Sequence, residues 1–304
     1  KMSVDLKELA SEYWQCVASS LNSNDSVLTK LKENMGELDR RFAGSGQQDA
    51  HEFLIQLLGT EGASSVFGVE TYRKLWCQNC KFEFDAPTVL ENVLCVPLIS
   101  AADRNEGNVS SQEDKSLEKV SLEKLLKKTL EPETLADYKC ENCQVTSSTK
   151  QQENLIKRTS DILIVKLVRY IFEGSSPRSV KIKREVAIPK DLSFAENEYQ
   201  IHGVVLHRGE NVSSGHYVSV VRSLRDNEWF HCDDATVRHI SSDKLFQHGN
   251  FSTENPDDVP YILLYNRLGN DMGMRVSADA SGVYAGRTDH ARAEPAASRA
   301  GDTV

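Results

Sequence analysis

Apolar residues recur at helical spacing through the first sixty residues of the chain. Two stretches with apolar side chains three or four residues apart predict helices over about 6–21 and 27–35. A third helix is expected to open at Ser45, because Ser45 and Gln48 have the spacing of a capping box. Its apolar face would consist of Ala50, Phe53, Leu54, Leu57 and Leu58.

The pattern changes to strands after about residue 69. Residues 69–76 alternate between polar and apolar side chains, and 81–84 return antiparallel to them. Residues 120–126 predict a short amphipathic helix. The nearly continuous apolar run 161–168 predicts a central buried strand. Further strands are expected at 200–206, 215–222, 228–232 and 260–266.

Two segments are too polar to join a core. Residues 101–117 are rich in Ser, Asp, Glu and Asn, and we interpret them as a flexible insert. Residues 269–304 have no lysine and almost no large apolar side chain, so we expect a disordered tail. The contrast with the lysine-rich body suggests the hypothesis that this tail is foreign to the domain.

Composition describes an ordinary globular protein. The 304 residues are 39% hydrophobic and 27% charged, enough for one large domain or two small ones. No apolar run approaches a membrane span, and the first residues show no signal-peptide pattern. A net charge of −9 argues against nucleic acid and is compatible with a basic protein ligand. Seven cysteines without a secretory signal favour the reducing cytoplasm or nucleus.

Candidate chemistry is concentrated in a predicted hairpin over 214–237. A polar turn centred near Leu224 and Arg225 would set His216 opposite Asp233 or Asp234. An imidazole oriented by a carboxylate is the base half of a nucleophilic dyad or triad. The glycine before it, Gly215, leaves room for a substrate backbone. The residues alone do not rank Asp234 against Asp233.

Two Cys-x-x-Cys pairs indicate a metal site. The four thiolates of these pairs offer Zn²⁺ a closed tetrahedral shell, which is a structural rather than a catalytic arrangement. The long separation between the pairs departs from compact zinc fingers, and two redox or buried pairs are the alternative. The proposed ligands are Cys77, Cys80, Cys140 and Cys143.

Three motifs together resemble the ubiquitin-specific protease family of cysteine deubiquitinases. The run Gln47–Leu54 is similar to that family's signature helix, and Gly215–Tyr217 to its histidine box. The two cysteine pairs lie between these motifs and fit its zinc-binding fingers. The resemblance covers roughly residues 25–266, with the motifs in the family's order.

The resemblance implies an α+β, papain-like ubiquitin-specific protease fold over 1–268. An incomplete helical thumb would take about 1–60, zinc-ribbon fingers about 69–160 and a β-sheet palm about 161–266. It further implies ubiquitin and ubiquitinated proteins as partners, with hydrolysis of the isopeptide bond after the ubiquitin C-terminus. His216 would be the general base, Asp233 would orient it, and Asp234 would support the site. The substrate-binding residues would be Gln48, Asp49, Gly215 and Tyr217.

The family's nucleophilic cysteine lies in a Gly-Asn-Thr-Cys-Tyr box that this chain does not contain. Cys16 is expected in the interior of a helix and Cys95 in the packing of a strand. The thiol of Cys232 has a carboxylate neighbour, which raises a thiol pKa. We therefore expect the chain to be a truncated, inactive form of a deubiquitinase.

The same residues are compatible with other interpretations of the chain. The chain could be a non-catalytic ubiquitin-binding pseudo-protease, or a zinc-ribbon scaffold with no ubiquitin role. His51 is expected on a solvated helix face, and His202 and His207 as ordinary strand residues. The loop 208–214 contains glycine and serine and could move when ubiquitin binds.

Overall fold

The structure, a computed structural model, describes residues 24–59, 66–99, 118–135, 138–147, 150–172, 179–211, 214–224 and 226–269. The helix expected over 6–21, the insert 101–117 and the tail beyond 269 lie outside these residues. The chain divides into two units, residues 1–268 and residues 269–304. All the helices and strands that the structure describes belong to the first unit.

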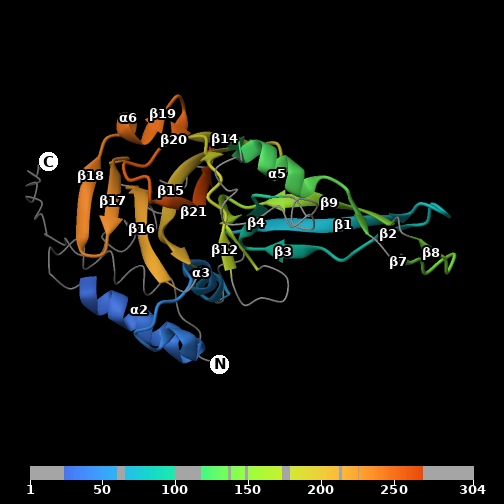
Figure 1. Cartoon of the computed structure of the whole chain (residues 1–304), viewed down its shortest axis with the longest axis horizontal. Helices are drawn as coiled ribbons and strands as arrows, with labels where there is room; N and C mark the ends of the chain where they lie inside the picture. The colour runs from blue at the N-terminus through green and yellow to red at the C-terminus, as the bar shows by residue number, and fades with distance from the viewer. Residues whose placement is uncertain are drawn as a thin grey trace, which may run out of the picture. The chain divides into compact units, whose positions relative to one another are not determined.

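Helices form the described N-terminal part (Figure 1). They are α2 (Asn24–Leu38), the short 3-10 helix η1 (Arg40–Phe42) and α3 (Ala50–Leu58). Gly36 lets η1 fold back on α2, because a Cβ there would lie 2.8 Å from Ala43 Cα. The Phe42 and Phe53 rings then meet edge to face at 5.4 Å and pack η1 against α3.

The expected capping box at Ser45 and Gln48 is wrong. The carboxylate of Asp49 accepts the backbone N–H groups of His51 at 2.8 Å and Glu52 at 3.0 Å. Asp49 is therefore the N-cap, and α3 begins at Ala50. An aspartate cap satisfies two free N–H groups and also complements the positive end of the helix.

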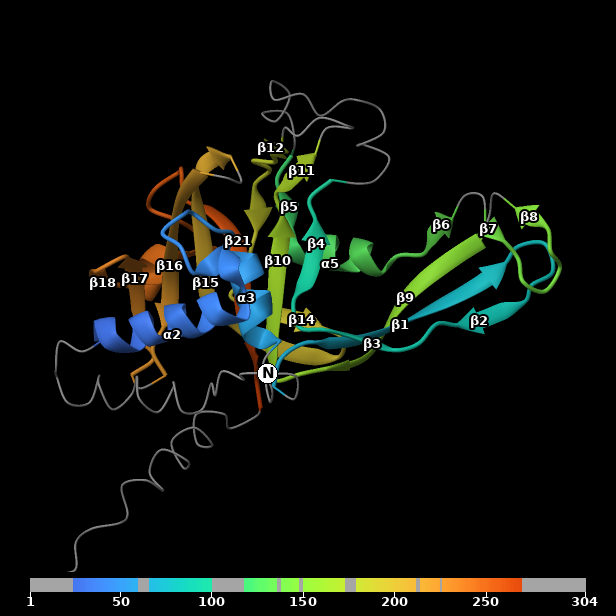
Figure 2. The same ribbon diagram turned by 90° about the horizontal axis from the view of Figure 1, so that it is seen from below.

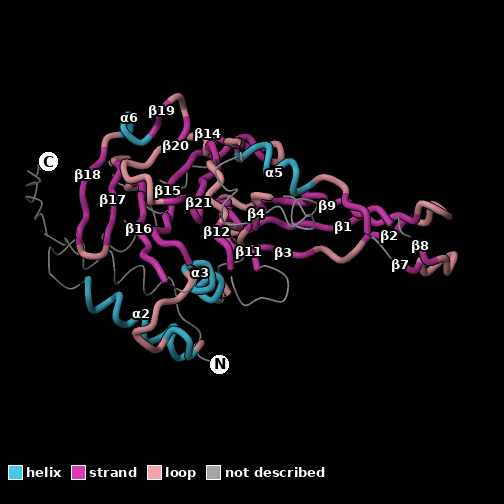
Figure 3. Tube along the Cα trace, viewed as in Figure 1, coloured by secondary structure: helices cyan, strands magenta, loops and turns pink. Residues whose placement is uncertain are grey.

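An eight-stranded mixed sheet carries the core (Figure 3). Its order is β18-β17-β16-β15-β21-β10-β4, and β14 pairs with β15. The predicted apolar strand is β10, whose side chains at 163, 164, 165 and 167 are almost fully buried. It is not central, because it lies beside the edge strand β4, with which it pairs in parallel. The strands are β4 (Leu94–Pro97), β10 (Ile162–Val168), β14 (Asp191–Phe194), β15 (Asn197–Asn211), β16 (Ser214–Arg222), β17 (Trp229–Asp233), β18 (Thr236–Ile240) and β21 (Val259–Arg267).

A second sheet extends away from the first along the β1–β9 ladder (Figure 2). It consists of β1 (Val69–Cys77), β2 (Glu83–Asp85), β3 (Val89–Glu91), β6 (Glu133–Leu135) and β9 (Lys150–Thr159). The remaining short elements are β5 (Val120–Ser121) with β13 (Val186–Ala187), β7 (Tyr138–Lys139) with β8 (Thr146–Ser147), β11 (Tyr170–Phe172) with β12 (Ser179–Lys181), β19 (Phe246–Gln247) with β20 (Asn250–Phe251), and α6 (Ser242–Leu245).

The amphipathic helix expected near 120–126 is α5 (Leu122–Leu130). Ser121 caps it by accepting the N–H of Lys124 at 3.2 Å. Three leucines at helical spacing, Leu122, Leu125 and Leu126, pack into the main core. None of the helices in the described part of the chain is long and apolar enough to cross a membrane.

Buried polar contacts join the two sheets where β9 turns into β10. The hydroxyl of Tyr199, a fully buried residue, donates to Thr159 Oγ1 at 2.8 Å or to the Ser160 carbonyl at 3.0 Å. The Arg267 guanidinium donates to the Thr159 carbonyl at 2.5 Å. Because buried polar groups are costly to leave unpaired, these contacts fix the direction in which the second sheet leaves the first.

Leu263→Ala on β21 should lower the free energy of unfolding by about 2–5 kcal/mol, because Leu263 is fully buried in the main core. Leu268→Ala is the matched control. Leu268 is 47% exposed, so its removal should change stability by no more than about 0.5 kcal/mol. Urea denaturation measures both changes, and equal losses would contradict this location of the core.

Candidate active site and metal centre

His216 and Asp233 meet on one face of the eight-stranded sheet. The Nε2 atom of His216 lies 2.6 Å from Asp233 Oδ1. An ionised carboxylate accepts a hydrogen bond but cannot donate one, so Nε2 carries the proton. Nδ1 is then the basic nitrogen, and its lone pair is available to accept a proton from another group. Both side chains are about one third exposed.

The observed register is offset by two residues from an expected pairing of His216 with Asp233. Ser219 pairs with Cys232, and the turn closes through a hydrogen bond from the Ser223 N–H to the Glu228 carbonyl. Continued by one residue, this register places Asp233 opposite Val218 rather than His216. The two functional side chains are therefore diagonal neighbours on the same face, a separation that long side chains span.

An ion pair between half-buried Arg208 and buried Asp258 lies beside the Asp233 carboxylate. The Arg208 guanidinium binds both oxygens of Asp258, at 2.8 and 3.1 Å, and lies 3.7 Å from Asp233 Oδ2. The hydrogen bond from His216 lowers the pKa of Asp233, with a smaller contribution from the Arg208 charge. Asp233 thus stays ionised wherever the protein is folded near neutral pH.

Asp234 occupies the tight turn that follows β17, with φ at 49°. It is exposed, and one of its carboxylate oxygens lies within 4.8 Å of ligand atoms of His216 and Asp233. The structure thus brings Asp234 to the rim of the pair, without a direct hydrogen bond to either of its members among the described contacts.

The signature helix reaches the histidine strand through Gln47, a residue that the sequence motifs did not single out. Gln47 accepts the Gly215 N–H with its amide oxygen and donates to the Gly215 carbonyl, each at 3.0 Å. The resemblance had favoured its neighbour Gln48, which is exposed. Two adjacent glutamines were the available signal, but nothing local distinguishes the one that binds a strand residue 168 positions away.

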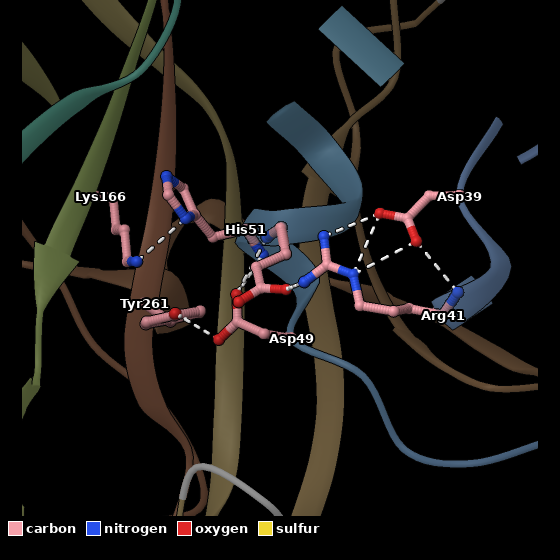
Figure 4. A network of polar contacts seen from close by, with 7 residues as sticks. Asp39, Arg41, Asp49, His51, Lys166 and Tyr261 are labelled. Carbon is pink, nitrogen blue, oxygen red and sulfur yellow. Dashed lines mark hydrogen bonds and ion pairs between the residues drawn. The ribbon is translucent and has the colours of Figure 1, made fainter. Parts of the chain in front are cut away.

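Asp49 has a second role beyond capping (Figure 4). Its Oδ2 atom accepts a hydrogen bond from the Tyr261 hydroxyl at 2.6 Å. Burial raises the pKa of Tyr217 to about 12, and the Asp49 charge beside it adds to the rise. Asp49 and Tyr217 therefore lie together at the junction of α3 and the sheet. Arg41 bridges Asp39 and Glu52 at the start of the same helix.

His51, expected on a solvated face, is only 8% exposed, so that expectation is wrong. Lys166 Nζ lies 2.9 Å from its Nδ1 (Figure 4). Cys95 Sγ lies 3.9 Å from its Nε2. Burial, and then the Lys166 charge, lower the pKa of His51 to about 4. A lysine ammonium can only donate, so Nδ1 accepts and Nε2 keeps its proton. His51 cannot deprotonate the thiol.

Cys95 was expected in strand packing, but the residue is exposed on β4. Its pKa is still raised, because the surrounding protein desolvates the thiolate. Four strand spacings separate β4 from β16, about 19 Å. Cys95 therefore does not reach His216.

Cys232 is also unsuited to act with His216. It precedes Asp233 on β17, so its side chain points to the opposite face of the sheet. Burial raises the pKa of this thiol. Among the described residues no thiol lies at the His216 imidazole, and Cys16 lies outside them.

The four finger cysteines converge at the far end of the β1–β9 ladder. Cys77 Sγ lies 3.8 Å from Cys143 Sγ, and Cys80 Sγ lies 3.7 Å from Cys140 Sγ. All four sulfur atoms lie within 4.8 Å of one another. The distances are too long for disulfides, whose sulfur atoms lie about 2.05 Å apart. Four thiolates around zinc at about 2.3 Å would be separated by about 3.8 Å, so the group is compatible with Zn²⁺.

Each knuckle repeats the geometry of the other. Lys81 and Gln144, directly after the second cysteine of each pair, have φ values of 59° and 58°. Asn79 and Asn142 also exchange contacts, because each side-chain amide donates at 3.5 Å to the second cysteine of the opposite knuckle. The contact from Asn142, followed by a backbone hydrogen bond from Phe82, lowers the pKa of Cys80 to about 6. Lower thiol pKa values favour metal binding.

Residues 1–265 match the family model of ubiquitin carboxyl-terminal hydrolases. The match spans most of the chain, so the chain belongs to the ubiquitin carboxyl-terminal hydrolase family. The resemblance drawn from the three motifs is thereby confirmed at the level of the family.

Curated relatives are much longer than the matched segment. Ubiquitin carboxyl-terminal hydrolase 51 of Mus musculus is 28% identical over 276 residues, covering 74% of this chain and 39% of that protein. Ubiquitin carboxyl-terminal hydrolase 10 of Saccharomyces cerevisiae is 29% identical over 186 residues, covering 57% of this chain and 21% of that protein. The chain thus spans less than half the length of these two relatives.

A solved structure confirms the predicted fold. The SAGA Ubp8/Sgf11/Sus1/Sgf73 DUB module bound to ubiquitin aldehyde superposes with a TM-score of 0.58 at 19% identity. The match covers 82% of this chain and 56% of that chain. At this identity the likeness establishes the ubiquitin-specific protease fold alone. The chemistry of the site is argued from its own residues.

The pH dependence of stability tests the environment of Asp233. Because its folded-state pKa is lowered, the stabilisation from its ionised form is complete above the unfolded value, about 3.9, and is lost as pH falls through the folded value. Urea unfolding should show Asp233→Asn less stable than the parent above about pH 5. The gap should begin to narrow below about pH 4 and close as pH falls through the lowered folded-state pKa. A gap that does not narrow below about pH 4 would contradict the ion-paired carboxylate.

Proposed function

We propose that this chain forms the ubiquitin-binding body and the base half of a cysteine-type deubiquitinase. The reaction is hydrolysis of the isopeptide bond that follows the C-terminal glycine of ubiquitin. The 2.6 Å contact between His216 Nε2 and Asp233 carries the proposal, because it leaves Nδ1 as the nitrogen that accepts a proton. Membership of the family supports the choice of reaction.

His216 acts first as a base and then as an acid. Nδ1 takes the proton of a cysteine thiol, and the thiolate attacks the isopeptide carbonyl. The resulting imidazolium returns the proton to the leaving lysine amine as the carbon–nitrogen bond breaks. Water, deprotonated by the same nitrogen, then hydrolyses the thioester and frees the cysteine. Asp233 stabilises the imidazolium throughout, and Asp234 supports the site from its rim.

The substrate path in this proposal runs between α3 and the histidine strand. Gly215 lies on that strand, with its N–H and carbonyl both held by Gln47. Asp49 offers a carboxylate to the arginines of the ubiquitin tail, with Tyr217 beside it and Gln48 exposed before the helix. The proposed partners are accordingly ubiquitin and ubiquitinated proteins rather than nucleic acid.

The nucleophile in this proposal comes from sequence outside these 304 residues, because the chain contains no Gly-Asn-Thr-Cys-Tyr box. Hydrolysis by this chain alone is not expected. A non-catalytic ubiquitin binder is the alternative, and it predicts binding without hydrolysis in any longer form. The proposed locations are the cytoplasm and the nucleus, which agrees with six described cysteines that are all free.

A ubiquitin probe with a C-terminal electrophile separates these possibilities. This chain should bind ubiquitin saturably but form no covalent adduct. A form extended upstream through a cysteine box should be labelled, and His216→Ala should slow that labelling at least about a thousandfold. His239→Ala is a matched control, because His239 lies on the exposed strand β18, where its ring contacts Glu228 at 2.7 Å and packs against Phe230.

Two results would overturn the proposal. The probe could label Cys16, Cys95 or Cys232 in this chain, and His216→Ala could abolish that labelling. This result would show that the nucleophile lies within these 304 residues. Absence of ubiquitin binding would remove the function altogether. Binding without labelling of the extended form would favour the non-catalytic alternative.

We further propose that the finger cysteines hold one structural Zn²⁺. The ligands would be Cys77, Cys80, Cys140 and Cys143, whose sulfur separations match a tetrahedral shell. Bound zinc would fold the end of the second sheet and would take no part in the reaction.

Metal analysis of the purified chain should find about one equivalent of zinc. Cys140→Ser should lose most of it and expose the finger end to proteases, while the His216 hairpin stays folded. Cys95→Ser is the control, since Cys95 lies on β4 and should leave the zinc content unchanged. Less than about half an equivalent in a fully folded parent would exclude the site.

A further inference from the structure

The strand ladder does not hold Gly215 in place. Pairing between β15 and β16 is regular up to Arg208 with His216, and then shifts before Asn211 with Ser214. Gly215 therefore lies at the irregularity, directly before the histidine of the dyad. A hydrogen-bonded distance of 2.6 Å at His216 requires a fixed backbone, so other groups must supply the restraint.

His207 occupies the space on one side of Gly215. A Cβ atom built on Gly215 would overlap His207 Nε2 and would lie 2.8 Å from His207 Cε1. On the peptide itself, Gln47 holds both the N–H and the carbonyl of Gly215. The imidazole and the amide together leave the glycine little room to move.

The His207 ring is itself held by groups from other strands. It is 2% exposed, and its Nδ1 lies 2.7 Å from the Tyr170 hydroxyl and 3.3 Å from Lys181 Nζ. The Tyr217 ring packs against it with centroids 4.8 Å apart. Lys181 also donates to the carbonyl of Gly209 at 2.5 Å, which fastens the other end of the same turn. His207 was expected to be ordinary, and these contacts correct that expectation.

The protonation state of His207 fixes its orientation. Burial, and then the Lys181 charge, lower its pKa to about 4, while Asp49 opposes the shift. The ring is therefore uncharged at neutral pH. Lys181 can only donate, so Nδ1 is an acceptor, and Nε2 carries the proton on the side that faces Gly215.

We propose that His207 is a positioning residue, whose ring holds the Gly215 backbone where His216 Nε2 meets Asp233. His207 pairs with Tyr217, whereas Arg208 pairs with His216, so His207 lies on the opposite face of the sheet from the dyad. It acts through the glycine and not by contact with the reacting groups. This inference rests on the proposed function of His216 and Asp233.

The proton on His216 Nε2 provides a direct test. In the chain labelled with ¹⁵N-histidine, that proton should give a downfield resonance that His216→Ala removes. His207→Ala should abolish the resonance or speed its exchange with water at least about tenfold, the effect of losing one hydrogen bond. His207→Gln, whose amide reaches the place of Nε2, should restore most of the protection.

His202→Ala is the matched control. His202 lies on the same strand, β15, at an even position, whereas His207 lies at an odd one. A general loss of structure in β15 would change the resonance in both variants alike. If His207→Ala fails to fold, Tyr170→Phe removes only the hydroxyl that binds Nδ1, and it should speed exchange in the same direction. An unchanged resonance and exchange rate in a folded His207→Ala variant would overturn the inference.

Ubiquitin binding is measured separately on the parent chain. Failure to bind ubiquitin would refute the proposed function but leave the resonance test intact. Binding that persists while His207→Ala leaves the resonance unchanged would refute only the positioning role.

Discussion

The register of β16 against its two neighbours is the constraint on which the site depends. Pairing with β15 sets Arg208 beside His216, and pairing with β17 brings Asp233 onto the same face. A slip of one residue would move every side chain of β16 to the opposite face. Buried Val218 and Val220 resist such a slip, because it would expose them. Hydrophobic packing thus sets the geometry of a polar site.

The sequence predicted the presence of helices and strands better than it predicted the residues at which they begin and end. Alternation and apolar runs located β1, β2, β10, β15, β16, β17 and β21, because burial on one face leaves a local period of two. They did not locate β9, β14 or β18. The turn after β16 was placed one residue early, since Asn227 adopts a positive φ of 62° that polar composition does not reveal. The start of α3 was misplaced for a similar reason. Asp49 competes with Ser45 as a cap, and tertiary contact with Tyr261 favours Asp49.

The residues that the sequence missed all act across the sheet. His51 meets Lys166 at a separation of 115 residues, and Gln47 meets Gly215 at a separation of 168. His207 is buried by side chains from β11, β12 and β16. No period or neighbouring residue encodes such contacts. The finger cysteines were found because both halves of that site carry their own local motif.

Two histidines on this sheet, His207 and His216, and a third on α3, His51, differ in the charge that each one faces. His51 and His207 each face a lysine from within the protein, so the protonated ring would be desolvated beside a like charge. Both pKa values fall to about 4, and both rings serve as fixed hydrogen-bonding groups. His216 instead faces Asp233 and solvent, so its partner is a carboxylate and not a lysine. The lysines therefore keep the rings of His51 and His207 uncharged and fixed. His216, beside a carboxylate, is the ring that takes up a proton in the proposed reaction.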